Sequence, residues 1–370
     1  MVAPSAAPIA FFLPSVRGGG AQRVVVNLVQ GIAARGHAVD VVLATADGVF
    51  LSQLPAAVRL VDLRAGRLIR SLGPLTRYLR RERPRCLVSS MSHANLIALW
   101  AARLAGGGTP VMVTVHNTMS QSTGQGGALG RLIEPLLLRV FYPWAASIVA
   151  VSGGAADDLA KISGLPRPRV KVVYNPVITP PMLALSRQAP DHAWLAPGEP
   201  PVVLGVGRLT RQKDFATLIR AFALVRRQRR ARLIILGEGE ERPALEALTR
   251  ELDLAADVAL PGFRDNAMAY MARSALFVLS SAWEGLPTVL IEALAAGTQV
   301  VSTDCPSGPR EILQEGRLGA LVPVGDVTAL ADAMLQVLDR PPAVVPTHAL
   351  EPFTSDAAVE RYLQLIESGP

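Results

Sequence analysis

The sequence predicts an α/β protein built from two doubly wound parallel sheets, each with helices on both faces. Three observations support this fold class. Short apolar runs recur along the 370-residue chain and alternate with longer stretches of helical periodicity. The short runs are continuously apolar, which is typical of parallel strands that are covered on both faces. A proline-rich break at residues 175–201 then divides the series into two halves.

The first half is predicted as a Rossmann-like domain at residues 1–178. Three glycines lie between its first strand and its first helix, at residues 21–35, and a further helix is expected at residues 93–104. The predicted strands are residues 9–13, 39–44, 59–63, 86–90, 111–115, 148–151 and 170–174.

The second half is predicted as another Rossmann-like domain at residues 201–345, after an interdomain linker at 179–200. A tail at 346–370 holds a last helix, residues 355–367, which could pack back on the first domain. The two domains are expected to face each other across a cleft at the carboxyl ends of both sheets. The predicted strands are residues 202–205, 232–236, 258–260, 276–279, 299–302 and 320–323, and the helices 215–227, 243–252, 286–296, 310–314 and 327–338.

Composition indicates a soluble, cytoplasmic protein. Half of the residues are apolar, so each domain can bury a core. Cys86 and Cys305 lie far apart in sequence and are expected to be buried free thiols in a reducing compartment. No CxxC pair and no His/Cys cluster is present, so a structural zinc site is not expected. No basic leader precedes the first strand, and no run reaches the ~18 apolar residues of a spanning helix.

Basic residues are concentrated in the first half. Residues 1–190 carry 20 Lys and Arg against 7 Asp and Glu, whereas residues 191–370 carry 17 against 23. The excess peaks from Arg64 to Arg85, where leucines interleave with arginines at roughly helical spacing. Such a surface suits anionic lipid headgroups, and a solvated helix face gives the same pattern. Peripheral contact with the inner face of the plasma membrane is the expected role, since no nucleic-acid motif accompanies the arginines.

Two loops of the first domain carry candidate ligand-binding residues. Glycines 18–20 let the backbone approach a ligand and precede a helix N-terminus that can hold an anion. The loop is not a dinucleotide fingerprint, because Arg23 occupies the position of its last glycine. His116 and Asn117 end the fifth predicted strand, where a neutral imidazole could hydrogen-bond to a substrate hydroxyl.

Two cations flank the first strand-to-helix turn of the second domain. Arg208 and Lys213, next to a helix N-terminus, predict a clamp for a pyrophosphate. Asp214 is expected to cap that helix.

Two glutamates, Glu284 and Glu292, lie on either side of a short loop, Gly285-Leu286-Pro287. Pro287 is expected in the first turn of a helix, so that Glu292 lies ~7–8 Å further along its axis. Amides near Gly285 can point at a phosphate. A carboxylate beside a phosphate is repelled unless it binds hydroxyls. Glu284 is therefore predicted to bind sugar hydroxyls, and Glu292 ribose hydroxyls.

These motifs, taken in order, resemble retaining glycosyltransferases of family 4, which have the GT-B fold. The second half carries "GVGRLTRQKDFATLI", "LIILGEGEERPALE", "LPGF", the E-x7-E stretch "EGLPTVLIE", "STDCPSGPREIL" and "GALVPVGD". The first half matches more sparsely, through the glycine loop, "TVHN", "VAVSGG" and "VVYNPV". Several motifs in one order are more specific than any single motif.

The resemblance implies a nucleotide-sugar donor, often a UDP-sugar, bound by the second domain. Arg208 and Lys213 would hold the donor diphosphate, and Gly285 and Leu286 would supply amides. Glu292 would bind the ribose. The family generally needs no metal, and no DxD triplet is present; no cofactor is expected.

The resemblance also implies roles near the reacting sugar and the base. Gly19 and Gly20 would approach the distal phosphate, and His116 would contact the sugar near the reacting centre. Phe263 and Arg264, which follow "LPG", would lie where backbone groups hold the base. The residues predicted to be catalytic are His116, Arg208, Lys213 and Glu284.

No acid ends a strand near His116, so a front-face mechanism is the hypothesis rather than a covalent glycosyl-enzyme. The leaving phosphate would take the proton of the acceptor, helped by Arg208 and Lys213. The acceptor is expected to be a glycan or a lipid-linked molecule of bacterial envelope polysaccharide or lipopolysaccharide synthesis. Three other functions stay open: a UDP-N-acetylglucosamine 2-epimerase, an inactive scaffold subunit and a nicotinamide enzyme.

Overall fold

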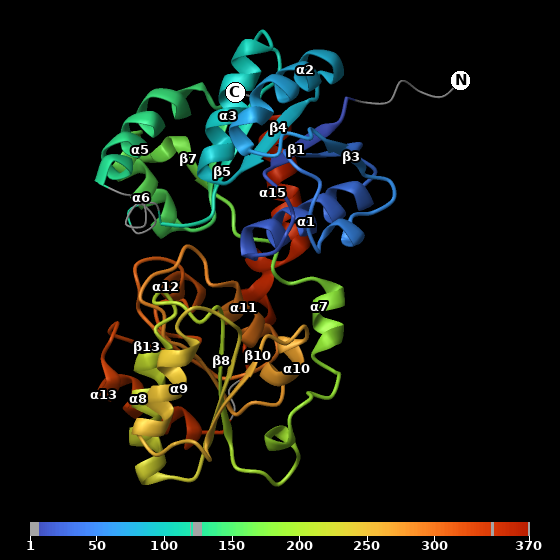
Figure 1. Ribbon diagram of the computed structural model, residues 1–370. Helices are drawn as coiled ribbons and strands as arrows, with labels where there is room; N and C mark the ends of the chain where they lie inside the picture. The colour runs from blue at the N-terminus through green and yellow to red at the C-terminus, as the bar shows by residue number, and fades with distance from the viewer. Residues whose placement is uncertain (1–6, 119, 121–127, 342–343, 369–370) are drawn as a thin grey trace. The chain divides into compact units, whose positions relative to one another are not determined.

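The computed structural model describes residues 7–118, 120, 128–341 and 344–368. The chain forms two compact units, each with one parallel sheet (Figure 1). The first unit comprises Met1–Val177 and Pro352–Pro370, and the second comprises Ile178–Glu351. Residues 179–200, predicted as a linker, cluster with the second unit. The prediction of two doubly wound Rossmann-like sheets is confirmed.

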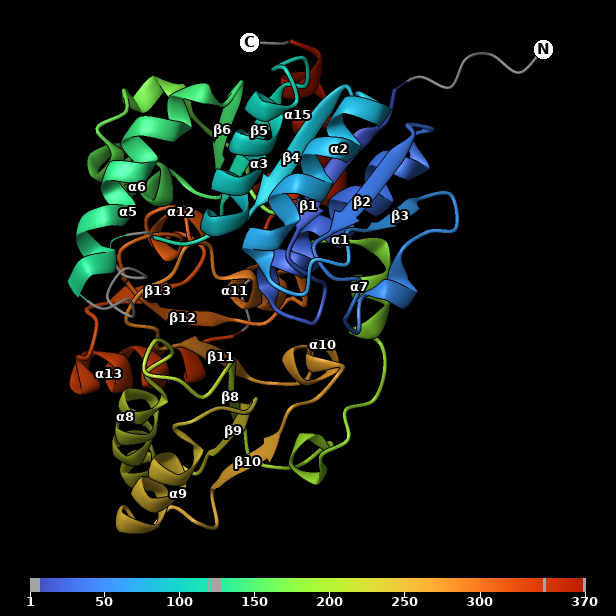
Figure 2. The same ribbon diagram turned by 45° about the horizontal axis from the view of Figure 1, so that its top comes forward.

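The first sheet has the order β3-β2-β1-β4-β5-β6-β7, with parallel pairing throughout (Figure 2). Every residue of β1, β2, β4 and β5 is buried, as expected for parallel strands that are covered on both faces. β3 is largely exposed because it forms one edge of the sheet. The strands are β1 (Ile9–Leu13), β2 (Val39–Leu43), β3 (Arg59–Asp62), β4 (Cys86–Ser90), β5 (Val111–Val115), β6 (Ser147–Ala150) and β7 (Val170–Val172).

Helices cover both faces of the first sheet, over two separate hydrophobic cores. The C-terminal helix packs beside the first helix (Figure 1). Their approach is so close that a side chain at Gly31 would place its Cβ 2.5 Å from Val359. The helices are α1 (Gly20–Ala34), α2 (Leu72–Glu82), α3 (Ser92–Leu104), α5 (Ala128–Phe141), α6 (Gly153–Ser163) and α15 (Ser355–Glu367).

The arginine-rich segment is not one continuous helix. A 3-10 turn at Leu68–Ser71 precedes α2, and the chain turns into left-handed backbone at Arg64 and Arg83. Ile69 is exposed, whereas Leu75 and Leu79 are buried in the core. The helical spacing predicted for the apolar residues therefore holds only within α2.

The second sheet has the order β10-β9-β8-β11-β12-β13, again all parallel. Its strands are β8 (Val202–Val206), β9 (Arg232–Leu236), β10 (Val258–Gly262), β11 (Leu276–Leu279), β12 (Val300–Thr303) and β13 (Ala320–Val322). Its helices are α7 (Pro180–Leu185), α8 (Phe215–Gln228), α9 (Arg242–Glu251), α10 (Ala267–Met271), α11 (Thr288–Ala295), α12 (Pro309–Ile312), α13 (Val327–Leu338) and α14 (Thr347–Leu350).

The helix predicted from residue 286 begins two residues later. Pro287 is the N-cap of α11, with ψ at 95°, and is not in its first turn. The amides of Gly285 and Leu286 thus belong to the loop before the helix.

Cys86 and Cys305 are buried and free, as predicted. Burial raises the pKa of each thiol to about 12. Over the described parts of the chain, every helix is too short or too polar to cross a membrane.

Candidate active site

Each sheet changes its winding direction at one strand pair, and doubly wound folds bind ligands at the carboxyl ends of such a pair. In the second unit this pair is β8 and β11. Arg208 and Lys213 lie in the loop between β8 and α8, and Glu284 lies in the loop after β11. The fold therefore brings loops 71 residues apart in sequence to one point on the sheet edge.

Lys213 and Glu284 form a buried ion pair at this point. Lys213 Nζ donates to Glu284 Oε1 at 2.6 Å, and the two side chains are only 14% and 7% exposed. The Ser281 hydroxyl donates to the same carboxylate oxygen at 2.7 Å. Charge pairing and hydrogen bonding together offset the cost of removing both charges from water.

The turn that holds Lys213 is shaped around it. Gly207 lies beneath the lysine stem, and a Cβ there would come within 3.1 Å of Lys213 Cε. Asp214 caps α8, as predicted, by accepting from the amide of Thr217 at 3.3 Å. Arg208, in contrast, is exposed and can reach a ligand from solvent.

Hydrogen bonds tie the two loops together. Gln212 Nε2 donates to the carbonyl of Trp283 at 3.0 Å, and the amide of Ala282 donates to the carbonyl of Gln212 at 2.8 Å. The Ser280 hydroxyl donates to the carbonyl of Lys213 at 2.8 Å. Sequence reasoning missed these supporting residues, although two serines directly after a buried strand were a usable signal.

A third loop supports the short segment between the two glutamates. The Ser307 hydroxyl donates to the carbonyl of Gly285 at 2.7 Å. Ser307 and Gly308 have φ of 127° and 93°, and a Cβ at Gly308 would lie 2.4 Å from Pro287 Cδ. Strained backbone of this kind persists only where the surroundings hold it. These residues belong to the motif "STDCPSGPREIL", but nothing in the sequence indicated that they contact the loop between the two glutamates.

The donor residues predicted in the second half of the chain also lie in the second unit. Glu292 is half-buried on α11, and Leu286 is buried. Phe263 and Arg264 follow β10, which is separated from β8 by β9. Phe263 is 67% exposed, and its carbonyl accepts from Arg264 Nη1 at 3.2 Å.

In the first unit the glycine loop follows β1, one strand of the pair β1 and β4 where the winding reverses. α1 begins at Gly20, and Gly18 and Gly19 have φ of 144° and 116°, which side chains rarely adopt. The amide of Gly18 donates to Gln22 Oε1 at 3.0 Å. Gln22 is a further residue that sequence reasoning did not single out.

His116 directly follows β5, as predicted, and is partly buried. Its Nε2 lies 3.1 Å from the hydroxyl of Thr114, which lies 2.8 Å from the hydroxyl of Ser90. Within the described part of the chain its buried Nδ1 has no hydrogen-bond partner. Burial lowers the pKa of His116 to about 4, so the imidazole is neutral near pH 7. A neutral ring with one unsatisfied nitrogen suits a hydrogen bond to a ligand hydroxyl.

The lowered pKa of His116 predicts a pH dependence of stability. The unfolded imidazole titrates near pH 6.5 and the folded one near pH 4. As the pH falls from about 6.5 to about 4, the unfolded chain takes up the proton before the folded chain does, so the free energy of unfolding decreases. Below this range both states are protonated at His116 and its contribution no longer changes. His116→Asn should lack this loss. Urea unfolding of both proteins at pH ~7 and ~5 measures it, and parallel pH profiles would rule it out.

Among the residues that the structure describes, no three His, Cys, Asp or Glu side chains are grouped to hold a metal ion.

Both halves of the chain are similar to known proteins. The family model described as "Glycosyl transferases group 1" matches residues 187–347, and that described as "Glycosyltransferase Family 4" matches residues 18–179. The chain is 31% identical over 277 residues to N-acetylgalactosamine-N,N'-diacetylbacillosaminyl-diphospho-undecaprenol 4-alpha-N-acetylgalactosaminyltransferase of Campylobacter jejuni, covering 75% of this chain and 70% of that protein. It is 32% identical to the lipopolysaccharide core biosynthesis glycosyltransferase LpsE of Rhizobium meliloti, covering 60% of this chain and 64% of that one.

Among solved structures, that of Anabaena HepE in complex with UDP superposes with a TM-score of 0.78 at 21% identity, over 98% of this chain and 100% of that one. At this identity the likeness concerns the fold. Both halves of the chain match glycosyltransferase models, and a relative above 30% identity is covered over more than two thirds of its length. The chain therefore belongs to the glycosyltransferases with the GT-B fold.

Proposed function

We propose that the chain is a retaining, metal-independent glycosyltransferase of family 4 that uses a UDP-sugar. The observation that carries the proposal is the buried Lys213–Glu284 pair at the carboxyl ends of β8 and β11. It places a cation and a carboxylate 2.6 Å apart. A ligand with both kinds of group could bind Lys213 through a phosphate and Glu284 through hydroxyl groups. HepE, which has a similar fold, binds UDP.

Donor binding would replace the ion pair with two ligand contacts. The diphosphate would draw Lys213 away from Glu284 and would also bind exposed Arg208. Glu284, still held by Ser281 at 2.7 Å, would then accept from hydroxyls of the transferred sugar. Gly285 and Leu286 would direct amides at the phosphates.

Other residues predicted for the site would bind the remaining parts of the donor. Glu292 would bind the ribose hydroxyls. Phe263 and Arg264 would hold the base through backbone groups. His116 would contact the transferred sugar, and Gly19 and Gly20 would approach the distal phosphate.

The transfer itself would follow a front-face route. The acceptor hydroxyl oxygen bonds to the anomeric carbon on the face from which the diphosphate leaves. The bond between that carbon and the phosphate oxygen breaks, and the departing phosphate takes the hydroxyl proton. Arg208 and Lys213 stabilise the negative charge that develops on the diphosphate. Detection of a covalent glycosyl-enzyme would refute this route.

The acceptor would be a glycan or a lipid-linked molecule of bacterial envelope synthesis, reached from the cytoplasmic face. The relatives from C. jejuni and R. meliloti are named for a diphospho-undecaprenol substrate and for lipopolysaccharide core synthesis. Peripheral contact with an anionic membrane through the segment from Arg64 to Arg85 is part of this proposal. Arg77, Arg80 and Arg81 of that segment are exposed on α2.

A donor screen tests the proposal. Purified protein is incubated with UDP-, GDP- and ADP-sugars in the presence of a chelator, and nucleotide release and thermal shift are followed. We expect UDP-sugars alone to respond, and Glu292→Ala to lose at least about tenfold in donor affinity. Glu251→Ala, at the exposed end of α9, removes the same charge and should respond like the unmodified protein. The absence of both nucleotide release and a thermal shift with every nucleotide-sugar would overturn the proposal.

A further inference from the structure

The first unit contains a pocket of about 540 Å³ at the amino ends of its strands, whereas His116 follows the carboxyl end of β5. Val111 begins β5 directly after Pro110, Ala145 and Ala146 precede β6, and Arg169 precedes β7. The pocket thus lies at the amino ends of three strands, whereas His116 and the glycine loop follow carboxyl ends. It is separate from every residue of the candidate active site.

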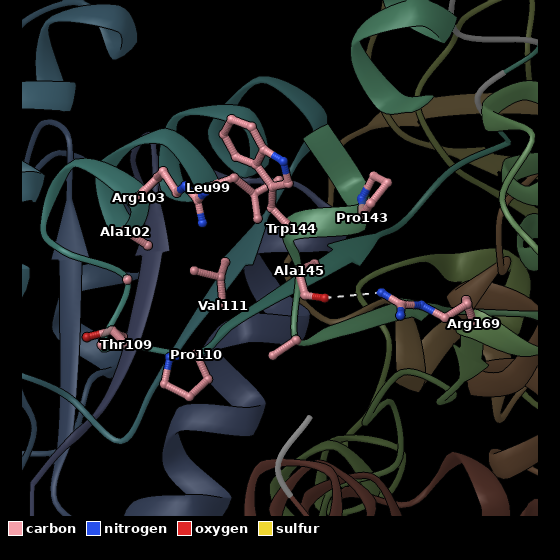
Figure 3. Close-up of a pocket in the computed structure, with 13 residues that line it drawn as sticks. Leu99, Ala102, Arg103, Thr109, Pro110, Val111, Pro143, Trp144, Ala145 and Arg169 are labelled. Carbon is pink, nitrogen blue, oxygen red and sulfur yellow. Dashed lines mark hydrogen bonds between the residues drawn. The ribbon is translucent and has the colours of Figure 1, made fainter. Parts of the chain in front are cut away.

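The pocket is cationic and partly aromatic. Arg103 and Arg169 flank it on opposite sides, and Trp144 lies beside it (Figure 3). The Arg103 guanidinium lies 5.6 Å from the ring of Trp144, and Arg169 Nη2 donates to the carbonyl of Ala145 at 3.5 Å. The lining contains no acidic side chain, and among the described residues neither arginine forms an ion pair. Two exposed guanidinium groups around one hollow suit a phosphate group.

An apolar stripe continues from the rim of this pocket. Residues three and four apart on a helix share one face, and α5 places Ile133, Leu136 and Val140 in that spacing. Trp144 ends the 3-10 turn that directly follows α5, and Leu104 follows Arg103 at the end of α3. These five side chains, which we call the α5 stripe, are each 41–59% exposed. Exposed apolar side chains gathered in this way mark an interaction surface rather than scattered surface residues.

We propose that this face docks on an anionic phospholipid bilayer, with a lipid phosphate in the Arg103–Arg169 pocket and the α5 stripe among the acyl chains. Trp144 belongs to both the pocket lining and the α5 stripe, and a tryptophan in that place matches the boundary between headgroups and hydrocarbon. A soluble anion would leave the stripe without a role. A second copy of the chain would bring two basic surfaces together, because residues 1–190 carry 20 basic against 7 acidic residues.

This inference rests on the membrane contact proposed above and specifies which residues make it. Arg80 Nη2, on α2, donates to the carbonyl of Leu104 at 2.6 Å, so the arginines of α2 adjoin the stripe. The new element is that the lipid-binding surface extends beyond the segment from Arg64 to Arg85, to the end of α3, to α5 and to Arg169 before β7.

Vesicle flotation tests the docking surface on the full chain. Vesicles contain phosphatidylcholine alone or with about a third phosphatidylglycerol. The unmodified protein should float only with the anionic vesicles. Arg103→Gln with Arg169→Gln, and separately Leu136→Ser with Val140→Ser, should each reduce the bound fraction at least about tenfold. Arg220→Gln with Arg250→Gln, both exposed in the second unit, removes the same charge and should leave flotation unchanged.

The same variants are tested for a thermal shift with UDP, which separates the two proposals. An unchanged UDP response shows that a variant is folded and that the donor site is independent of docking. Normal flotation of both the pocket and the stripe variants would overturn the inference. So would loss of flotation only in Arg77→Gln with Arg81→Gln, which would assign the contact to α2. Equal flotation with neutral vesicles would contradict the proposed preference for an anionic bilayer.

Discussion

Lys213→Met is expected to destabilise the second unit by about 3–5 kcal/mol and to abolish donor binding. The substitution leaves Glu284, whose side chain is 7% exposed, as a buried carboxylate without its cation. Breaking a buried pair from one side is costly for this reason. The hydroxyl of Ser281 remains at 2.7 Å but cannot neutralise the charge. Urea unfolding measures the stability, and calorimetry with UDP measures the binding.

The double variant Lys213→Met with Glu284→Leu separates stability from function. Replacing a buried pair by apolar side chains is often neutral for stability, so most of the lost stability should return. Donor binding should not return, because neither the cation nor the carboxylate is present. If the double variant bound UDP as the unmodified protein does, the pair would be structural only. If Lys213→Met cost less than about 1 kcal/mol, the pair would be no more than a surface contact.

Gly308→Ala is expected to weaken donor affinity about a hundredfold and to cost about 1–3 kcal/mol of stability. Its new Cβ would lie 2.4 Å from Pro287 Cδ and 3.2 Å from the carbonyl oxygen of Gly285. It would also force a side chain into backbone with φ of 93°. The loop that carries Gly285 and Leu286 must then shift, and the N-terminus of α11 with it. Calorimetry with UDP and urea unfolding report the two effects.

Gly325→Ala is the matched control for this substitution. Gly325 has φ of 75° and no atom within 4 Å of its Cβ position, so it carries the backbone strain without the clash. It should lose some stability but keep its donor affinity. Equal donor affinities for the two variants would show that the Gly308 contact does not position the loop.

The sheets could be predicted from sequence because their strands are buried on both faces. Continuous apolar runs such as β1 and β5 have only one good explanation in a chain of this composition. The exposed edge strand β3 was predicted at the right place because it follows the same alternation. The position of α11 was predicted two residues early, since Pro287 suits both a cap and a first turn.

Contacts between loops could not be predicted, because they depend on strand order. The sequence marked Lys213 and Glu284 separately, but only the adjacency of β8 and β11 makes them a pair. In the same way, only the structure shows that Ser281 donates to Glu284 and that Ser307 donates to the carbonyl of Gly285. The α5 stripe was missed because helical spacing of leucines predicts a buried face as readily as an exposed one.

Amide hydrogen exchange with and without UDP locates the nucleotide on the chain. We propose that it binds at the carboxyl ends of β8 and β11. Saturating UDP should therefore slow exchange in residues 207–214 and 284–292, with little change in β5 to β7 of the first unit. Protection confined to the first unit, or nucleotide binding without protection of these two segments, would contradict the account.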